Sequence, residues 1–282
     1  MYVFIVNPVS GKGKGLKMGK RLDNYLRDKD INYKIIYTKK SGDAKKIAKK
    51  YSMSDNIIYS VGGDGTLNEV VNGMVFGKAF LDIIPVGSGN DFYRVFKNNI
   101  SKSLDIGRVN KRYFINISSF GLDAITCMDA EGMKKHKIPS KFIYAFSLIK
   151  NFIAYKPLKI SIDDKECNIT ILTICNGSYY GGGFKIAPHA ILNDGKFEVI
   201  ESFDINKFQV FKLLLKIPKG RHIYDDKINT FSCDKISIRS KKKLCCNVDG
   251  EIIYGKNFEY VLHKDAIKVH LNDELGLNKL LR

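Results

Sequence analysis

The first part of the chain alternates short apolar runs with stretches whose apolar residues recur at helical spacing. The runs cover residues 2–6, 33–37, 57–61 and 81–84, and they are β-rich without strict alternation. Such runs are typical of parallel strands buried on both faces. The helical spacing predicts helices over about residues 16–29, 43–50 and 67–76. The alternation as a whole predicts an α/β fold with right-handed crossovers.

From about residue 115 the pattern changes, and short β-like runs dominate. These runs cover residues 158–162, 169–175, 197–202, 235–239, 258–262 and 267–271, with turn signals between them. A helix is expected over residues 207–217, and the apolar stretch 142–155 favours a buried helix over a membrane-inserting one. This half therefore predicts an antiparallel β-sandwich. We expect one domain over residues 1–120 and a second over residues 121–272.

The net charge adds information about partners. The 282 residues include 47 Lys and Arg against 29 Asp and Glu, a formal charge of +18. Such a surface attracts nucleotides, nucleic acid or acidic lipid, although a merely lysine-rich solvated surface is the alternative. No recognised nucleic-acid motif is present, so we expect no nucleic-acid partner. The six cysteines show no Cys-x-x-Cys spacing, and no apolar run reaches the roughly 20 residues that span a bilayer. With a strand rather than a signal peptide at the start, we expect a cytoplasmic protein.

The richest candidate chemistry is the glycine-rich turn that follows the run 57–61, since Gly62, Gly63 and Gly65 lie within four residues. Glycines let a backbone approach a ligand closely, and a following helix start favours an anion. Asp64 within this turn would repel phosphate unless a cation intervenes, so the turn favours a metal–nucleotide site over a plain turn. Thr66 is a candidate helix cap or phosphate ligand. The turn is neither the dinucleotide fingerprint nor a P-loop.

Two further loops follow predicted strands at the same edge of the sheet, where ligands bind in such folds. Residues 7–15 carry Lys12 and Lys14 among glycines, and the alternative is a flexible basic loop. Residues 85–92 carry Ser88 and Asp91, for which a simple Asn-Asp helix cap is the alternative.

Residues 62–69 closely resemble the signature of the diacylglycerol kinase catalytic-domain family, which includes bacterial lipid kinases and sphingosine kinases. NAD kinases share only its Gly-Gly-Asp-Gly core. Residues 7–11 resemble the family's Asn-Pro-x-x-Gly loop, residues 85–92 its Pro-x-Gly-Thr-x-Asn-Asp-Phe segment with Ser88 in place of threonine, and residues 249–251 its Asp-Gly-Glu. The resemblance implies a Rossmann-like three-layer α/β domain, a β-sandwich domain for lipid substrate and metal, a nucleotide cleft between them, and residues 273–282 packing back on the first domain.

The resemblance also implies residue roles. Glu251, with Asp123 as the rival or partner, is the implied general base. The Asp194 side chain and the carbonyl groups of Ile191 and Lys196 are the implied Mg²⁺ ligands, and oxygen ligands suit that cation. The implied ATP-binding residues are Asn7, Pro8, Ser10, Gly11, Lys12, Thr38, Gly62, Gly63, Asp64, Gly65, Thr66, Leu67, Asn68, Ser88 and Asp91.

The implied activity is ATP-dependent phosphorylation of a lipid hydroxyl in phospholipid metabolism, with diacylglycerol as the first candidate. A sphingoid base, a polyprenol and a glycolipid remain open as acceptors. An NAD kinase and a non-catalytic nucleotide or lipid sensor are the rival functions. The substrate implies peripheral contact with an anionic membrane, at its cytoplasmic face, and a homodimer is left open.

Overall fold

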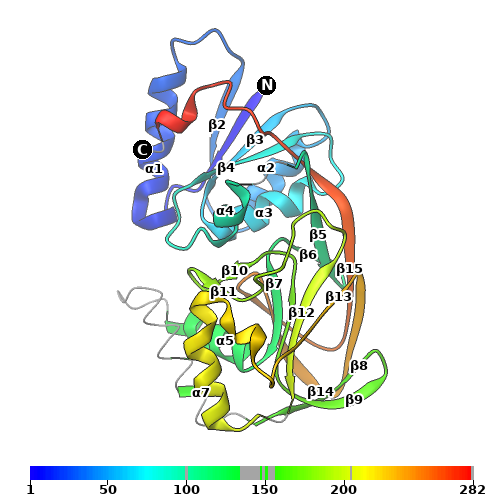
Figure 1. Ribbon diagram of the computed structural model, residues 1–282. Coiled ribbons are helices and arrows are strands. Elements are labelled where there is room, and N and C mark those ends of the chain that lie inside the picture. The colour runs from blue at the N-terminus through cyan, green and yellow to red at the C-terminus, as the bar shows by residue number, and fades with distance from the viewer. Residues whose placement is uncertain (99–100, 134–146, 148–149, 152–155, 204, 281–282) are drawn as a thin grey trace. The chain divides into compact units, whose positions relative to one another are not determined.

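The computed structural model describes all residues except 99–100, 134–146, 148–149, 152–155, 204 and 281–282 (Figure 1). The predicted helix over residues 142–155 lies largely outside the described residues. The chain forms two compact units, residues 1–106 with 264–282 and residues 107–263. Each unit is described separately below.

The first unit is a parallel sheet between two helical layers (Figure 1). Its strands lie in the order β4-β3-β1-β2, and the end of β15 pairs in parallel with β4. Helix α1 packs on one face through Met18, Leu22 and Leu26, while α2 and α3 contact each other on the other face. The bounds are β1 Tyr2–Val6, α1 Ser10–Leu26, β2 Tyr33–Tyr37, α2 Asp43–Tyr51, β3 Ile57–Gly62, α3 Asp64–Met74, β4 Phe80–Pro85 and α4 Asp91–Phe96.

The C-terminal segment also belongs to this unit. The hydroxyl of Tyr25 on α1 donates to the carbonyl of Leu275 at 3.0 Å. Leu275 and Leu277 are buried in the same apolar cluster as α1, and η3 (Leu277–Lys279) follows. The returning segment therefore completes the α1 side of the sheet.

The second unit is an antiparallel β-sandwich. Strand β9 pairs with both β7 and β8, and β14 pairs with the same two strands, so the sheet curls around an apolar core. Phe114, Phe120 and Tyr260 are among the rings packed there. The bounds are β6 Arg112–Phe114, β7 Ile117–Gly121, α5 Leu122–Met133, β8 Leu158–Ile162, β9 Lys165–Cys175, β10 Tyr179–Tyr180, β11 Phe184–Lys185, β12 Phe197–Phe203, α7 Lys207–Lys216, η1 Ile217–Lys219, η2 Arg221–Tyr224, β13 Asn229–Cys233 and β14 Lys235–Val248.

Two sequence expectations about elements are corrected. The run 258–262 and residues 267–269 of the last run are parts of one strand, β15 (Glu251–Val269), because the polar and mostly exposed residues between them continue the strand. The unit boundary falls at Gly107 rather than near residue 120. Strand β5 (Ser103–Val109) turns at Asn110, which has a φ of 52°, and pairs back through Gly107 with Phe114.

Candidate active site

Three loops of the first unit leave the sheet at the carboxyl ends of β1, β3 and β4. We call them the first loop (residues 7–13), the second loop (residues 62–66) and the third loop (residues 85–91). The amide of Asn7 donates to the carbonyl of Val61 at 3.0 Å. The amides of Val86 and Gly87 donate to the carbonyl of Gly62 at 2.9 and 3.2 Å. The sheet ladder therefore continues into the loops and holds them side by side.

Glycine is required where these loops touch. A Cβ on Gly87 would lie 2.4 Å from the Cα of Gly63, and a Cβ on Gly11 would lie 1.9 Å from the carbonyl oxygen of Val86. Gly11 and Lys12 also have φ angles of 58° and 59°, the left-handed region that favours glycine. The three predicted loops thus converge backbone to backbone at the sheet edge where ligands of parallel α/β sheets bind.

The predicted capping role of Thr66 is wrong. Helix α3 begins at Asp64, earlier than expected, and its N-cap Gly63 offers no side chain. The Thr66 hydroxyl is buried within the first turns and accepts a hydrogen bond from the Asn7 side-chain amide at 3.0 Å. Asn7 and Thr66 therefore tie the first loop to the second.

Asp64 has a partner within the protein. Its Oδ1 accepts a hydrogen bond from the backbone amide of Phe92, at the start of α4, at 3.2 Å. The start of α4, directly after the third loop, thus supplies a donor to Asp64, so this carboxylate has a structural contact besides the metal-linked role that remains a prediction. A Cβ on Gly89 would lie 3.0 Å from Asp64 Oδ2 and 3.7 Å from Asp91 Oδ2. Both carboxylates border the same glycine.

The Asn90 side chain does not cap α4, a role that the sequence analysis gave as the alternative for this segment. The Asn90 side chain accepts from the Gly87 amide at 3.1 Å and donates to the Gly87 carbonyl at 2.9 Å, so it closes the third loop rather than capping the helix. Asp91 is 5% exposed and lies 3.6 Å from the Arg94 guanidinium. Ser88 is exposed at the tip of the loop.

The remaining predicted nucleotide residues differ in how they are presented. Lys12 and Gly65 are exposed, whereas Leu67 and Asn68 are 3% and 5% exposed inside α3. Thr38 follows β2, and its amide donates to the Val6 carbonyl at 2.9 Å. Pro8 and Ser10 lie half-buried in the first loop.

The sequence reasoning gave no role to Glu69, although it belongs to the recognised motif. Its carboxylate accepts from the amides of Gly42 at 2.8 Å and Ala44 at 3.1 Å and from the Ser41 hydroxyl at 3.2 Å. Glu69 therefore fixes the start of α2 against α3. The one signal in the sequence for this role was position: Glu69 directly follows the run Gly-Gly-Asp-Gly-Thr-Leu-Asn.

In the second unit, Glu251 follows the tight turn between β14 and β15. Asp249 and Gly250 have φ angles of 50° and 90°, as a two-residue hairpin turn requires. The half-exposed Glu251 carboxylate forms an ion pair with the guanidinium of Arg112 on β6. The sequence analysis missed Arg112, since no local motif marks a partner 139 residues away.

Asp249, beside the predicted base, has a structural role. Its carboxylate accepts from the amides of Ile115, Asn116 and Ile117 at 2.7, 3.0 and 2.9 Å. These bonds anchor the turn that precedes Glu251 to residues 115–117, where β7 begins. Asp123, the alternative base, lies in the first turn of α5, and its side chain lies outside what the structure describes.

The predicted metal turn precedes β12. The exposed Asp194 carboxylate accepts from the Lys196 amide at 2.9 Å, and Ile191 is exposed as well. Glu198, which the sequence analysis missed, is 8% exposed and accepts from the His189 amide at 3.0 Å. Burial raises the pKa of Glu198; the charge of His189 and the amides of His189 and Ala190 oppose the rise, and the charge of Asp194 adds to it.

The described residues lack two kinds of feature. No group of three or more His, Cys, Asp or Glu side chains there could hold a metal ion. Within the same part of the chain, no helix is long and apolar enough to cross a bilayer.

Comparison with known proteins matches both units. Residues 1–114 match the family described as the diacylglycerol kinase catalytic domain. Residues 116–268 match the YegS C-terminal NAD kinase β-sandwich-like domain.

Curated relatives cover most of the chain. A diacylglycerol kinase of Staphylococcus aureus is 32% identical, covering 89% of this chain and 85% of the relative. A diacylglycerol kinase of Bacillus subtilis is 28% identical over 89% of each chain. A Bacillus anthracis crystal structure shares the fold, with a TM-score of 0.74, 24% identity and 96% and 97% of the two chains covered. The chain therefore belongs to the diacylglycerol kinase family and is an ATP-dependent lipid kinase.

Proposed function

We propose that the protein transfers the γ-phosphoryl group of ATP to the free hydroxyl of diacylglycerol, giving phosphatidic acid. The observation that carries the proposal is the convergence of the three glycine loops at the strand ends of a chain whose curated relatives are named diacylglycerol kinases. The enzyme class leaves the acceptor open, so diacylglycerol is the specific part of the proposal.

The first unit supplies the groups that bind the triphosphate in this proposal. The backbone of the three loops and the exposed Lys12 ammonium would hold its phosphates. Positioning and charge neutralisation provide most of the rate enhancement in phosphoryl transfer. The close backbone contacts at Gly11, Gly63 and Gly87 support this assignment, because they hold the backbones of the three loops in place against one another.

Glu251 is the general base in this proposal. Its carboxylate would accept the proton of the lipid hydroxyl as that oxygen bonds to the γ-phosphorus and the bond from phosphorus to the leaving ADP oxygen breaks. Arg112 holds the Glu251 carboxylate through the ion pair, and Asp249 fixes the turn from which Glu251 projects. Asp123 is the second candidate for the same proton.

Mg²⁺ fits the turn before β12 by the chemistry of its donors. The exposed Asp194 carboxylate and the carbonyl groups of Ile191 and Lys196 offer oxygen atoms, which this hard cation prefers. The buried Glu198 carboxylate adds negative charge beside Asp194. When bound, Mg²⁺ supplies positive charge that offsets the negative charge of nearby carboxylates and phosphates.

The acceptor is tested with labelled ATP and a panel of dispersed lipids: diacylglycerol, a sphingoid base, a polyprenol and a glycolipid. We expect label in phosphatidic acid, at a rate at least about tenfold above every other acceptor, the margin that a site bonding its own hydroxyl substrate gives easily. Faster labelling of another lipid would overturn the choice of diacylglycerol. Labelling of NAD with no lipid product would overturn the lipid acceptor altogether.

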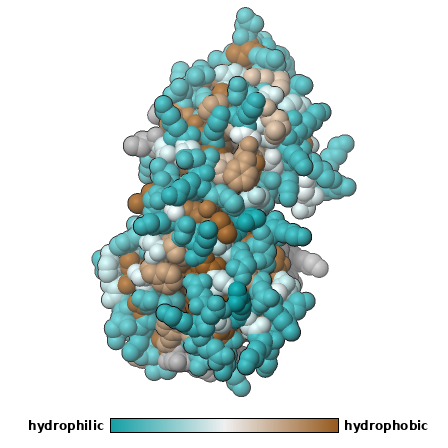
Figure 2. Space-filling view, turned by 90° about the vertical axis from the view of Figure 1, so that its right-hand side faces the viewer, coloured by the Kyte–Doolittle hydropathy of each residue, from teal (hydrophilic) through white to brown (hydrophobic). Residues whose placement is uncertain are grey.

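We further propose that the enzyme works at the surface of an anionic membrane, because its acceptor resides in a bilayer and its formal charge is +18. Hydrophilic residues cover most of the face seen in Figure 2, with apolar side chains scattered among them. A purely solvated lysine-rich surface would look the same from this side. Evidence for docking must therefore come from a specific place on the protein.

A further inference from the structure

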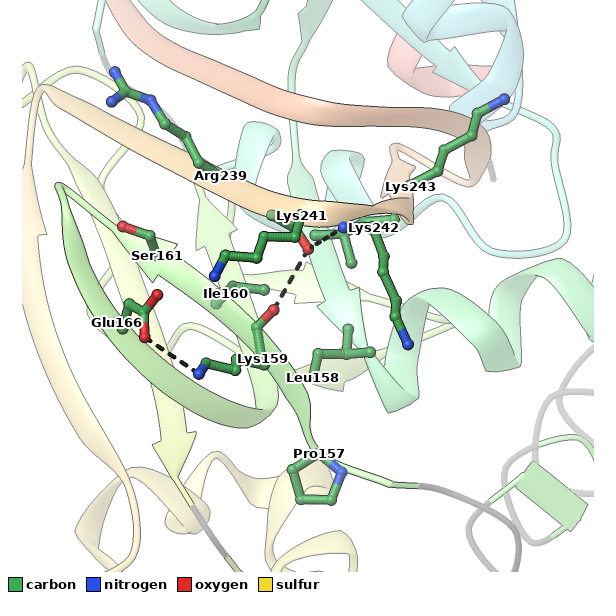
Figure 3. A pocket seen from close by; sticks show the side chains of 12 residues that line it. Pro157, Leu158, Lys159, Ile160, Ser161, Glu166, Arg239, Lys241, Lys242 and Lys243 are labelled. Carbon is green, nitrogen blue, oxygen red and sulfur yellow. Dashed lines mark hydrogen bonds and ion pairs between the residues drawn. The ribbon is translucent and has the colours of Figure 1, made fainter.

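A hollow of about 600 Å³ lies in the second unit, apart from every residue assigned above to nucleotide, base or metal (Figure 3). It is bordered by β8 and by the middle of β14. The residues that matter for the argument are Pro157, Lys159, Ile160, Lys241, Lys242 and Leu244.

A bulge in β14 forms one side of this hollow. Arg239 pairs with Asn257 and the next paired residue, Leu244, with Gly255. Strand β14 thus advances five residues while β15 advances two, which leaves three extra residues in β14. Bulges of this kind redirect side chains. In Figure 3, Lys241 and Lys242 both extend on the side of β8, although neighbours in a regular strand would point to opposite faces.

The charges of the hollow are unevenly compensated. Lys159 pairs with Glu166 at 3.3 Å, and Arg239 pairs with Asp164 at 2.7 Å. For Lys241 and Lys242, no carboxylate among the described residues lies within the 4.0 Å of an ion pair. The bulge therefore presents two ammonium groups, extending in different directions along β8, that no carboxylate of the described residues pairs.

The floor of the hollow is apolar. Ile160 and Leu244 line it and are 2% and 5% exposed, and Pro157 lies at one end in Figure 3. The bulge backbone is held in place, since the Ser240 hydroxyl accepts from the Lys242 amide at 3.2 Å and donates to the Lys159 carbonyl at 3.4 Å. Cations carried by a held backbone beside an apolar floor complement anionic amphiphiles, with phosphate at the ammonium groups and hydrocarbon against the floor.

We propose that this hollow is the site at which the protein docks on an anionic bilayer, with the phosphates of anionic phospholipid headgroups bound at Lys241 and Lys242. The neighbouring Lys243 extends to the other side of the strand, 5.5 Å from the centroid of the exposed Tyr254 ring. Tyrosine and lysine side chains are favoured at the membrane interface. The inference rests on the proposed function in one respect: docking would bring a lipid kinase to an acceptor that resides in a bilayer.

The test is sedimentation with vesicles of neutral phosphatidylcholine, with and without phosphatidylglycerol. For the double variant Lys241→Gln/Lys242→Gln we expect about 30-fold weaker binding to the anionic vesicles, at about 1 kcal/mol for each lysine near the surface. The matched control, Lys45→Gln/Lys49→Gln on exposed positions of α2, removes the same charge and should bind like wild type. The charge-retaining variant Lys241→Arg/Lys242→Arg should also bind like wild type, which shows that the bulge tolerates substitution.

Two results would overturn the docking site. Equal weakening by the hollow variant and the α2 control would show that only net charge matters. Displacement from the vesicles by glycerol 3-phosphate, at matched ionic strength, would show that the hollow takes a soluble phosphate instead of a bilayer. The kinase proposal is tested separately, since transfer to diacylglycerol in neutral detergent micelles should be the same in wild type and in the hollow variant. If wild type itself transfers no phosphate to diacylglycerol in the micelles, the kinase proposal is refuted and the docking site is unaffected.

Discussion

At the scale of single residues, Asp64 combines a structural contact with a predicted chemical role, and two substitutions separate them. Asp64→Ala removes the acceptor for the Phe92 amide and should cost about 1 kcal/mol of unfolding free energy, the usual cost of a lost cap. Asp64→Asn keeps an oxygen there and should leave stability near wild type. Both should lower turnover by at least about 100-fold, because each removes the charged oxygen group that we expect to hold a cation at the phosphate loops.

Thermal melts and lipid phosphorylation measured on the same preparations check this prediction. If Asp64→Asn retained wild-type turnover, the carboxylate would serve only to bond Phe92. The sequence placed the aspartate at the turn, but its donor at the start of α4, 28 residues away, is visible only in the structure.

Glu198 gives a pH prediction of definite sign. Because burial raises the pKa of this carboxyl above its ordinary value of 4.5, the folded state binds its proton more tightly than the unfolded state. Glu198 therefore lowers stability as pH rises above about that ordinary value, and the penalty is absent well below it. Glu198→Gln can still accept from the His189 amide and carries no such penalty.

We expect Glu198→Gln to gain unfolding free energy relative to wild type as pH rises from acidic to neutral, in metal-free buffer. Chemical unfolding at both pH values measures the difference. A variant whose disadvantage grew toward neutral pH would show instead that the ionised carboxylate stabilises the turn before β12. Glu201→Gln on the same strand, a residue whose pKa is also raised by burial, is the matched comparison.

At the scale of elements, α7 has an apolar stripe on its exposed side. Phe208, Phe211 and Leu215 are 77%, 53% and 68% exposed, whereas Val210 and Leu213 are buried. Phe208→Ser/Phe211→Ser should leave the unfolding free energy within about 0.5 kcal/mol of wild type, as surface substitutions do. Leu213→Ala should cost about 2–5 kcal/mol, because it leaves a cavity.

Denaturant unfolding followed by circular dichroism compares these variants. A loss of several kcal/mol in the Phe208/Phe211 variant would mean that another segment or another copy covers this face in solution. None of the three substitutions changes Asn206 or Gln209, so the capping box at the start of α7 is the same in every variant compared.

The elements differ in how well the sequence predicted them. The strands β1 and β2 were predicted with their observed bounds, and β3 and β4 to within one residue, because short buried parallel strands are nearly continuous apolar runs. Strands β14 and β15 were predicted only in parts. Their lysine-rich middle and the polar stretch before Ala266 were left out of the predicted strands, yet these residues continue the strands with most of their side chains in solvent.

At the scale of the whole molecule, the sequence predicted which three loops would meet at one edge of the sheet but few of their contacts. Glycines marked the loops since their backbones must touch, as Gly63 and Gly87 do. Arg112, Glu69 and Glu198 were missed because each acts on a partner far along the chain or on a backbone amide, and neither leaves a local pattern. Fold class and enzyme class were therefore accessible from the sequence, whereas the groups that position the candidate base were not.

The most direct test of the account measures ATP binding and lipid phosphorylation together for Glu251→Gln. Glutamine keeps the shape of the side chain but cannot accept the hydroxyl proton, so turnover on diacylglycerol should fall by about 100-fold or more. ATP affinity measured by calorimetry should stay within about threefold of wild type, a difference under 1 kcal/mol. Turnover near the wild-type rate, or a loss of ATP binding as large as the loss of turnover, would contradict the assignment of Glu251 as the general base of a lipid kinase.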